Sequence, residues 1–176
     1  VPIHPHPPEA PECGLKLGRR QSYKNLTVFS LLSDYAANAD YLTLDEALSG
    51  DLIDVVEKDE DGTVPELKVV NKSDRMVLIL DGEELVGAKQ NRIVNTTVLI
   101  AGNTTTVIPV SCVEEGRWSY KSDKLYSEKR MMSSKLRASK ADQVRYSLGN
   151  SGKFRSNQAE IWNDVEELAF DLDAAS

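Results

Sequence analysis

The chain has 176 residues, of which 40% are hydrophobic and 28% charged, which are the proportions of one folded domain rather than of a disordered segment. The formal net charge of −7 disfavours general nucleic-acid binding. The longest apolar run, Met76–Leu80, is far shorter than the about 20 residues that a membrane helix needs. Since no basic-then-apolar leader opens the chain either, we expect a soluble, cytoplasmic protein without membrane association.

Residues 1–20 are rich in proline, which fixes φ and removes backbone donors. We therefore expect an extended arm over 1–20 and a single globular domain over 21–176. Both histidines, His4 and His6, lie between prolines in this arm, and we expect them to be solvated. No metal site and no cofactor is predicted.

The first half of the domain reads as short strands with one helix. Lys24–Leu32 has a β-like pattern, and Thr43-Leu-Asp-Glu46 is a capping box that predicts a short helix near 43–50, ended by Gly50. Three further strands, separated by polar turns, are predicted at Ile53–Val56, Leu67–Val70 and Met76–Leu80.

Two longer strands are predicted next, at Ile93–Ile100 and Thr104–Cys112, after the turn dipeptide Asp81-Gly82. Pro109 cannot donate to a ladder, so we expect it at an edge or a bulge. Strands of this length and spacing predict a mainly β member of the α+β class, an antiparallel sandwich or a barrel-like sheet.

The C-terminal part predicts a helical hairpin against the sheet. Ser134–Leu148 has helical apolar spacing with Gly149 as its stop, and Asn157-Gln-Ala-Glu160 opens a second amphipathic helix. Lys and Arg dominate 121–155, whereas only acids follow Arg155. Ion pairs between the two helices explain this asymmetry; a basic surface for phosphates or a partner chain is the alternative, and nucleic acid is the least favoured partner.

Polar residues crowd into two segments that follow apolar strands, and we expect the two to meet at the end of the sheet. Glu83 or Glu114 would be the general acid or base of a catalytic site, so both are candidate catalytic residues. Cationic side chains suit a phosphate or carboxylate, amides suit the polar edges of a base or ribose, and Trp118 suits a flat ring. The candidate ligand-binding residues are Lys89, Gln90, Asn91, Arg92, Asn95, Arg117 and Trp118.

The same residues have a structural interpretation. Lys89 and Arg92 would neutralise Glu83 and Glu84 in a buried network, and Arg117 would pair with Glu114. Cys112 reads as a small buried hydrophobe, with a reactive thiol as the alternative. The sequence does not decide between a site and a network.

The stretches Gly-Glu-Glu-Leu-Val-Gly-Ala-Lys-Gln-Asn-Arg at 82–92, with Asn95 after it, and Ile-Pro-Val-Ser-Cys-Val-Glu-Glu-Gly-Arg-Trp at 108–118 resemble the ARG and rhodanese-phosphatase-superfamily-associated protein domain family. The resemblance runs from about Tyr23 to Leu172. The family name refers to an association with ADP-ribosylglycohydrolases and rhodanese-like phosphatases. By analogy the resemblance implies a ligand such as ADP-ribose or another NAD-derived nucleotide.

Three functional classes stay open. The favoured one is a domain that binds a small phosphorylated or nucleotide-like ligand. The others are a structural or partner-binding protein with internal polar networks, and a carboxylate-based hydrolase acting on such a ligand; a Ser-His-Asp triad is excluded because both histidines lie in the arm. Whether the protein is an enzyme and whether it forms a homo-oligomer are undecided.

Overall fold

The computed structural model describes residues 14–34, 40–58, 65–114, 121–171 and 173. The chain divides into two units, Val1–Ala39 and Asp40–Ser176. In the first unit, β1 (Leu15–Tyr23) and β2 (Leu26–Ser33) form an antiparallel hairpin, and Lys24 in its turn has a φ of 50°. β2 corresponds to the strand expected over 24–32, whereas β1 begins inside the segment 1–20 that was expected to be an extended arm.

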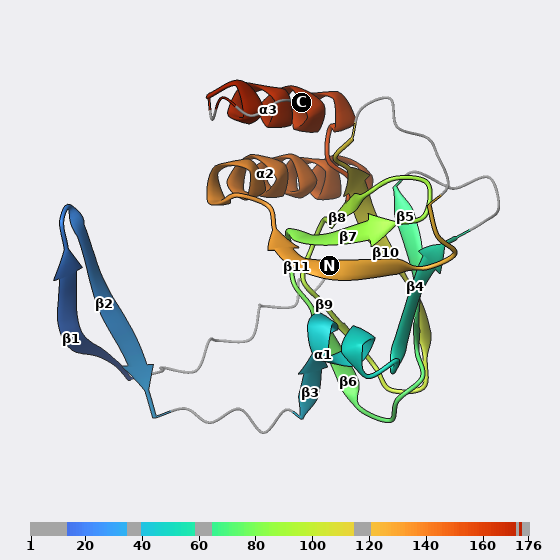
Figure 1. Ribbon diagram of the computed structural model, residues 1–176, viewed down its shortest axis with the longest axis horizontal. Coiled ribbons are helices and arrows are strands. Elements are labelled where there is room, and N and C mark those ends of the chain that lie inside the picture. Colours follow the sequence, from blue (N-terminus) through green and yellow to red (C-terminus); the bar gives the residue numbers. More distant parts are fainter. Residues whose placement is uncertain (1–13, 35–39, 59–64, 115–120, 172, 174–176) are drawn as a thin grey trace, which may run out of the picture. The chain divides into compact units, whose positions relative to one another are not determined.

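The second unit is built on a closed barrel of six strands, which confirms the mainly β, barrel-like expectation (Figure 1). Around the barrel the order is β10, β5, β4, β11, β7, β8, and β8 returns to β10. Every pairing is antiparallel. The strands are β4 (Ile53–Glu57), β5 (Glu66–Asn71), β7 (Glu83–Gly87), β8 (Arg92–Val94), β10 (Thr105–Cys112) and β11 (Leu125–Met131).

Alternation along the strands fills the barrel. In β4 and β5 every second residue is buried while its neighbours are half-buried, which is the pattern of strands with one face inward. The buried side chains are mostly branched aliphatics, which pack well on a pleated surface. The barrel's share of the core is Ile53, Val55, Leu67, Val69, Leu85, Val94, Ile108, Val110 and Leu125.

A small second sheet and a short helix share this core. β3 (Tyr41–Thr43) pairs in parallel with β6 (Met76–Ile79), and β6 pairs antiparallel with β9 (Val98–Ile100). Helix α1 (Leu44–Ser49) begins at Thr43 with the expected capping box, in which Thr43 and Glu46 satisfy each other's backbone donors, and it ends at Gly50. The apolar residues of this sheet and helix belong to the same buried cluster as the barrel residues.

The single strand expected over Ile93–Ile100 is wrong. The chain forms β8 in the barrel, bends at Asn95 and Thr96, and enters the second sheet as β9. Asn95 and Thr97 explain the break, because their side chains accept hydrogen bonds from Ser111 Oγ and from the Asp81 backbone N–H, respectively. Such side-chain bonds compete with regular strand pairing. Apolar spacing alone does not reveal such a change of sheet.

Pro109 lies one residue before the β10–β8 pairing begins at Val110. Its carbonyl accepts a hydrogen bond from Asn95 N at 3.0 Å. Proline has no backbone N–H, and here the missing donor lies just outside the paired residues of β10 and β8. For this reason β10 tolerates proline within a closed barrel.

The expected C-terminal helical hairpin is present. α2 (Ser134–Ser151) and α3 (Gln158–Asp171) lie side by side (Figure 1). α2 begins at the cap Ser133 and ends at Gly152, with φ 68°, one turn beyond the expected stop at Gly149. Lys135 and Glu167 are 4.0 Å apart, so the two helices share one of the ion pairs expected between them. In the described part of the chain, neither these helices nor α1 is long and apolar enough to span a membrane.

Candidate functional site

The β7–β8 hairpin carries most of the candidate residues to one end of the barrel. Leu85 pairs with Arg92, and the connecting turn spans 88–91. Gly87 has a φ of 126°, and a Cβ there would lie 2.6 Å from Ser122 Oγ and 2.9 Å from Lys124 O, so glycine is required for β11 to approach.

The pairing of β8 with β10 brings the two polar segments together. Arg92 lies opposite Cys112 in the register, and Asn91 N donates to Glu114 Oε2 at 3.0 Å. The expectation that residues 82–95 and the segment after β10 meet is therefore confirmed as far as Glu114. Arg117 and Trp118 lie outside the described residues.

Arg92 is fully buried inside the barrel. Its Nη1 donates to Cys112 Sγ at 2.7 Å, and its Nη2 lies 3.4 and 3.5 Å from the two carboxylate oxygens of Glu57. A direct charge-assisted hydrogen bond is usually about 2.7–2.9 Å long, so the contact with Glu57 is a loose one. The barrel thus encloses a guanidinium that contacts both Cys112 and Glu57.

Cys112 does not have the properties of a nucleophile. Its side chain is completely buried, and this burial raises the pKa of the thiol to about 11, although the Arg92 guanidinium beside it acts in the opposite direction. Because the thiolate is the reactive form, a protonated buried thiol is inert at neutral pH. The structure favours the interpretation of Cys112 as a small core residue.

In the turn at the barrel end, Asn91 stabilises the backbone through its side chain, whereas Gln90 leaves a buried acceptor unsatisfied. Asn91 donates from Nδ2 to Glu84 Oε1 at 3.1 Å and accepts at Oδ1 from Gly87 N at 3.4 Å, so its side chain fixes the turn. Gln90 is only 4% exposed, and its Oε1 has no hydrogen-bond partner among the described residues. Lys89 is half-buried in the same turn.

Asn95 belongs to a different neighbourhood. It follows the far end of β8, accepts from Ser111 Oγ at 2.7 Å and donates to the Phe154 carbonyl at 3.2 Å. These bonds attach the α2–α3 connection to the barrel. The structure does not bring Asn95 together with Gln90 and Arg92.

The two candidate catalytic carboxylates are also apart. Glu83 begins β7, whereas Glu114 accepts from the backbone N–H of Asn91, which directly precedes β8 at the other end of the hairpin. Glu83 accepts from Leu80 N at 2.9 Å, and burial raises the pKa of its carboxyl, with a smaller contribution from Asp45. Glu83 and Glu114 thus have different hydrogen-bond partners, Leu80 N and Asn91 N.

The sequence profile of the ARG and rhodanese-phosphatase-superfamily-associated protein domain matches residues 14–176. The chain belongs to this domain family. The match includes the β1–β2 hairpin and so extends further toward the N-terminus than the resemblance from about Tyr23. The stretches that carry the resemblance, 82–92 and 108–118, are neighbours in the barrel up to Glu114, because β8 pairs with β10. No curated protein and no solved structure matches this member of the family.

One buried ion pair of this family member was not found from the sequence. Lys140 has no exposed surface, contacts Asp81 Oδ1, and donates to Val94 O at 3.0 Å and Asn95 O at 3.2 Å. Burial lowers the pKa of its ammonium group. Its spacing of four residues from both Leu136 and Val144, the buried apolar residues of α2, is the signal that could have found it.

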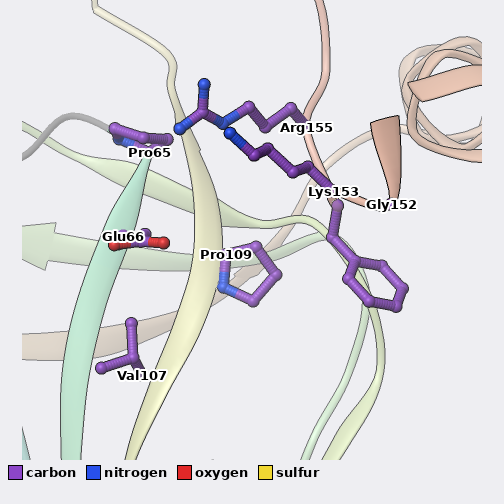
Figure 2. A pocket seen from close by; sticks show the side chains of 8 residues that line it. Pro65, Glu66, Val107, Pro109, Gly152, Lys153 and Arg155 are labelled. Carbon is purple, nitrogen blue, oxygen red and sulfur yellow. The ribbon is translucent and has the colours of Figure 1, made fainter. Parts of the chain in front are cut away.

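A hollow of about 340 Å³ lies where the α2–α3 connection crosses the outer face of the barrel (Figure 2). It is lined by Pro65, Glu66, Val107, Pro109, Gly152, Lys153, Phe154 and Arg155. In Figure 2 the side chains of Lys153 and Arg155 extend in the same direction across β10, toward Pro65. Lys153 and Arg155 belong to the basic stretch 121–155, for which a surface that binds phosphates or a partner chain was the alternative to ion pairs between the helices.

Proposed function

We propose that this domain binds a small phosphorylated, nucleotide-like molecule at the end of the barrel that carries Arg92. The observation that carries the proposal is the buried Gln90 carbonyl, which accepts no hydrogen bond from any described residue. A buried acceptor without a donor costs about 1–3 kcal/mol, so native proteins rarely retain one without a reason. A hydroxyl or amino group of a ligand would satisfy it.

Arg92 and Lys89 supply the charge that a phosphate needs. Inside the barrel a guanidinium interacts more strongly with an anion than it does in water, because the local dielectric constant is low. Arg92 Nη1 and Nη2 contact Cys112 and Glu57, and a ligand phosphate would be a further partner of the same guanidinium. The mouth of a β-barrel is also a common position for small-molecule sites.

The contacts divide the candidate residues by role. Lys89, Gln90 and Arg92 are proposed to touch the ligand, while Asn91 shapes the turn through Glu84 and Gly87. Arg117 and Trp118 are also proposed to contact the ligand, on the basis of the sequence alone. Of the two candidate catalytic carboxylates, Glu114 is the one that contacts the turn carrying Lys89 and Gln90.

Thermal unfolding with millimolar ADP-ribose, NAD, ADP and AMP tests the proposal. A ligand that binds only the folded state stabilises it by about 2.7 kcal/mol at a concentration of 100 times Kd. We expect at least one of the four to raise the Tm of the wild-type protein. A Tm that none of them moves would overturn the proposal.

The variant Gln90→Met separates binding from folding. Replacing an unsatisfied buried amide by an apolar side chain of similar length should leave the Tm of the ligand-free protein unchanged or raise it, while the ligand-induced shift is lost. Gln21→Met, in the β1–β2 hairpin, is the matched control and should keep the full shift. Equal ligand shifts in wild type and Gln90→Met would place the ligand elsewhere.

A further inference from the structure

The connection between α2 and α3 is held firmly against the barrel. Its Phe154 carbonyl accepts from Asn95, and Ser156 Oγ lies 2.5 Å from Ser111 Oγ. Directly after it, Gln158 bonds to the backbone of Cys112 twice, accepting from N at 2.9 Å and donating to O at 2.6 Å. These bonds fix the backbone of the connection, a fixed platform from which its other side chains extend.

Two of those side chains are cations without compensation. The Phe154 carbonyl and the Ser156 hydroxyl face the barrel through these bonds, while Lys153 and Arg155 extend over the hollow (Figure 2). Within the described ranges neither Lys153 nor Arg155 has an ion-pair or hydrogen-bond partner. The one acid that lines the hollow, Glu66, is bonded to Lys58 Nζ at 2.5 Å. The side chains that line the hollow therefore carry two positive charges and one negative charge, a net charge of +1, although the whole chain is acidic.

The rest of the lining is apolar and rigid. The rings of Pro65 and Pro109 and the side chains of Val107 and Phe154 contribute to it. Its volume of about 340 Å³ is within the roughly 300–1,000 Å³ of small-molecule pockets. A planar guanidinium and an ammonium in a hollow that Phe154 also lines suit a ligand that joins a phosphate group to a flat ring.

We infer that this hollow is a second binding site, for a small organic phosphate that carries an aromatic group. The site lies on the outer face of the barrel and involves none of the residues proposed for the Arg92 end. Lys153 and Arg155 bind the phosphate, and Phe154 with the two prolines contacts the ring. Because the platform is already fixed, little conformational entropy is lost on binding.

The test is a titration of the whole protein with phenyl phosphate, inorganic phosphate and phenol, followed by NMR shifts of the backbone amides of residues 152–156. We expect phenyl phosphate to bind at least tenfold more tightly than inorganic phosphate, and phenol to bind more weakly than phenyl phosphate. Equal affinity for phenyl phosphate and inorganic phosphate would remove the aromatic part of the inference. Shifts that spare residues 152–156, or no shifts at millimolar concentrations of phenyl phosphate, would overturn it altogether.

Variants distinguish this site from the other proposal and from general attraction of anions. Lys153→Ala with Arg155→Ala should weaken phenyl phosphate binding at least tenfold, whereas the double variant Lys135→Ala with Arg145→Ala, which removes the same charge from α2, should change it less than twofold. Gln90→Met should bind phenyl phosphate normally. If both double variants lose binding equally, the hollow is not a site; if Gln90→Met alone loses it, the probe binds at the barrel end.

Discussion

Lys140 fixes α2 to the barrel, and replacing it by methionine should cost much of the domain's stability. Methionine keeps most of the volume of lysine, so the change removes the ammonium group without opening a large cavity. The lost contacts are those with Asp81, Val94 O and Asn95 O. All three lie in the segments that enter and leave the β7–β8 hairpin.

The magnitude follows from what each acceptor retains. Val94 O keeps the hydrogen bond from Gly82 N at 3.0 Å and loses little. Asn95 O, in a residue that is 3% exposed, loses this donor at about 1–3 kcal/mol. Asp81, whose side chain is 26% exposed, loses its cation but regains some water, at about 1–2 kcal/mol. The total is about 3 kcal/mol, or a fall in Tm of roughly 6–12 °C for a domain of this size.

Urea unfolding followed by tryptophan fluorescence and circular dichroism measures this cost. Lys135→Met is the matched control: its lysine is on the same helix but 72% exposed, and we expect a change within about 0.5 kcal/mol. Asp81→Asn combined with Lys140→Met should be less destabilised than the sum of the single variants, because an amide tolerates burial without a cation better than a carboxylate does. If Lys140→Met unfolds at the urea concentration of the control, the ion pair is not what attaches α2.

Three further predictions concern the barrel itself. Burial raises the folded-state pKa of Glu83 above 4.5, so the wild-type protein loses stability as the pH rises above 4.5. Glu83→Gln should therefore be more stable than wild type at pH 7 but not at pH 4, as measured by urea unfolding. Glu167→Gln, on the exposed face of α3, is the control and should show no such gain. Cys112 should resist a thiol reagent at pH 8 in the native protein and react fully in 6 M guanidinium, and fast native labelling at this residue would contradict its burial. Gly87→Ala should destabilise the protein by more than about 2 kcal/mol, because the φ of residue 87 is 126° and a Cβ there would contact Lys124 O. Gly149→Ala is the control and should be neutral or stabilising, because nothing lies within 4 Å of its Cβ. A Tm for Gly87→Ala equal to that of wild type would refute the close approach of β11.

Local patterns in the sequence predict the elements that obey them and miss those that depend on partners. The capping box at Thr43 and Glu46 predicts α1 to the residue, and alternation predicts β4 and β5. β7 and β11 were missed because their sequences are polar for strands. Their polar residues are tolerated where one strand face lies outside the barrel or near its end. The break between β8 and β9 was missed because Asn95 takes partners far away in the sequence, in β10 and the α2–α3 connection.

The meeting of the two polar segments was predicted from the sequence, whereas the position of each residue within them was not. Unusual polar density after apolar strands correctly marks residues that lie together, such as Asn91 with Glu114 and Arg92 with Cys112. It does not say which side of a strand each residue faces, nor that Glu83 lies at the opposite end of β7 from Glu114. Lys140 was overlooked because a lysine on a helix is normally exposed, and only the barrel supplies the acceptors that allow it to be buried.

The most direct test of the account is the side-chain amide signal of Gln90 in an ¹H–¹⁵N NMR spectrum, assigned by its disappearance in Gln90→Met. We predict that this signal moves progressively as ADP-ribose is added to the wild-type protein and that the signal of Gln21 stays in place. If ADP-ribose and the other nucleotides bind while the Gln90 signal does not move, or if none of them changes the spectrum, the barrel end that carries Arg92 is not a ligand site.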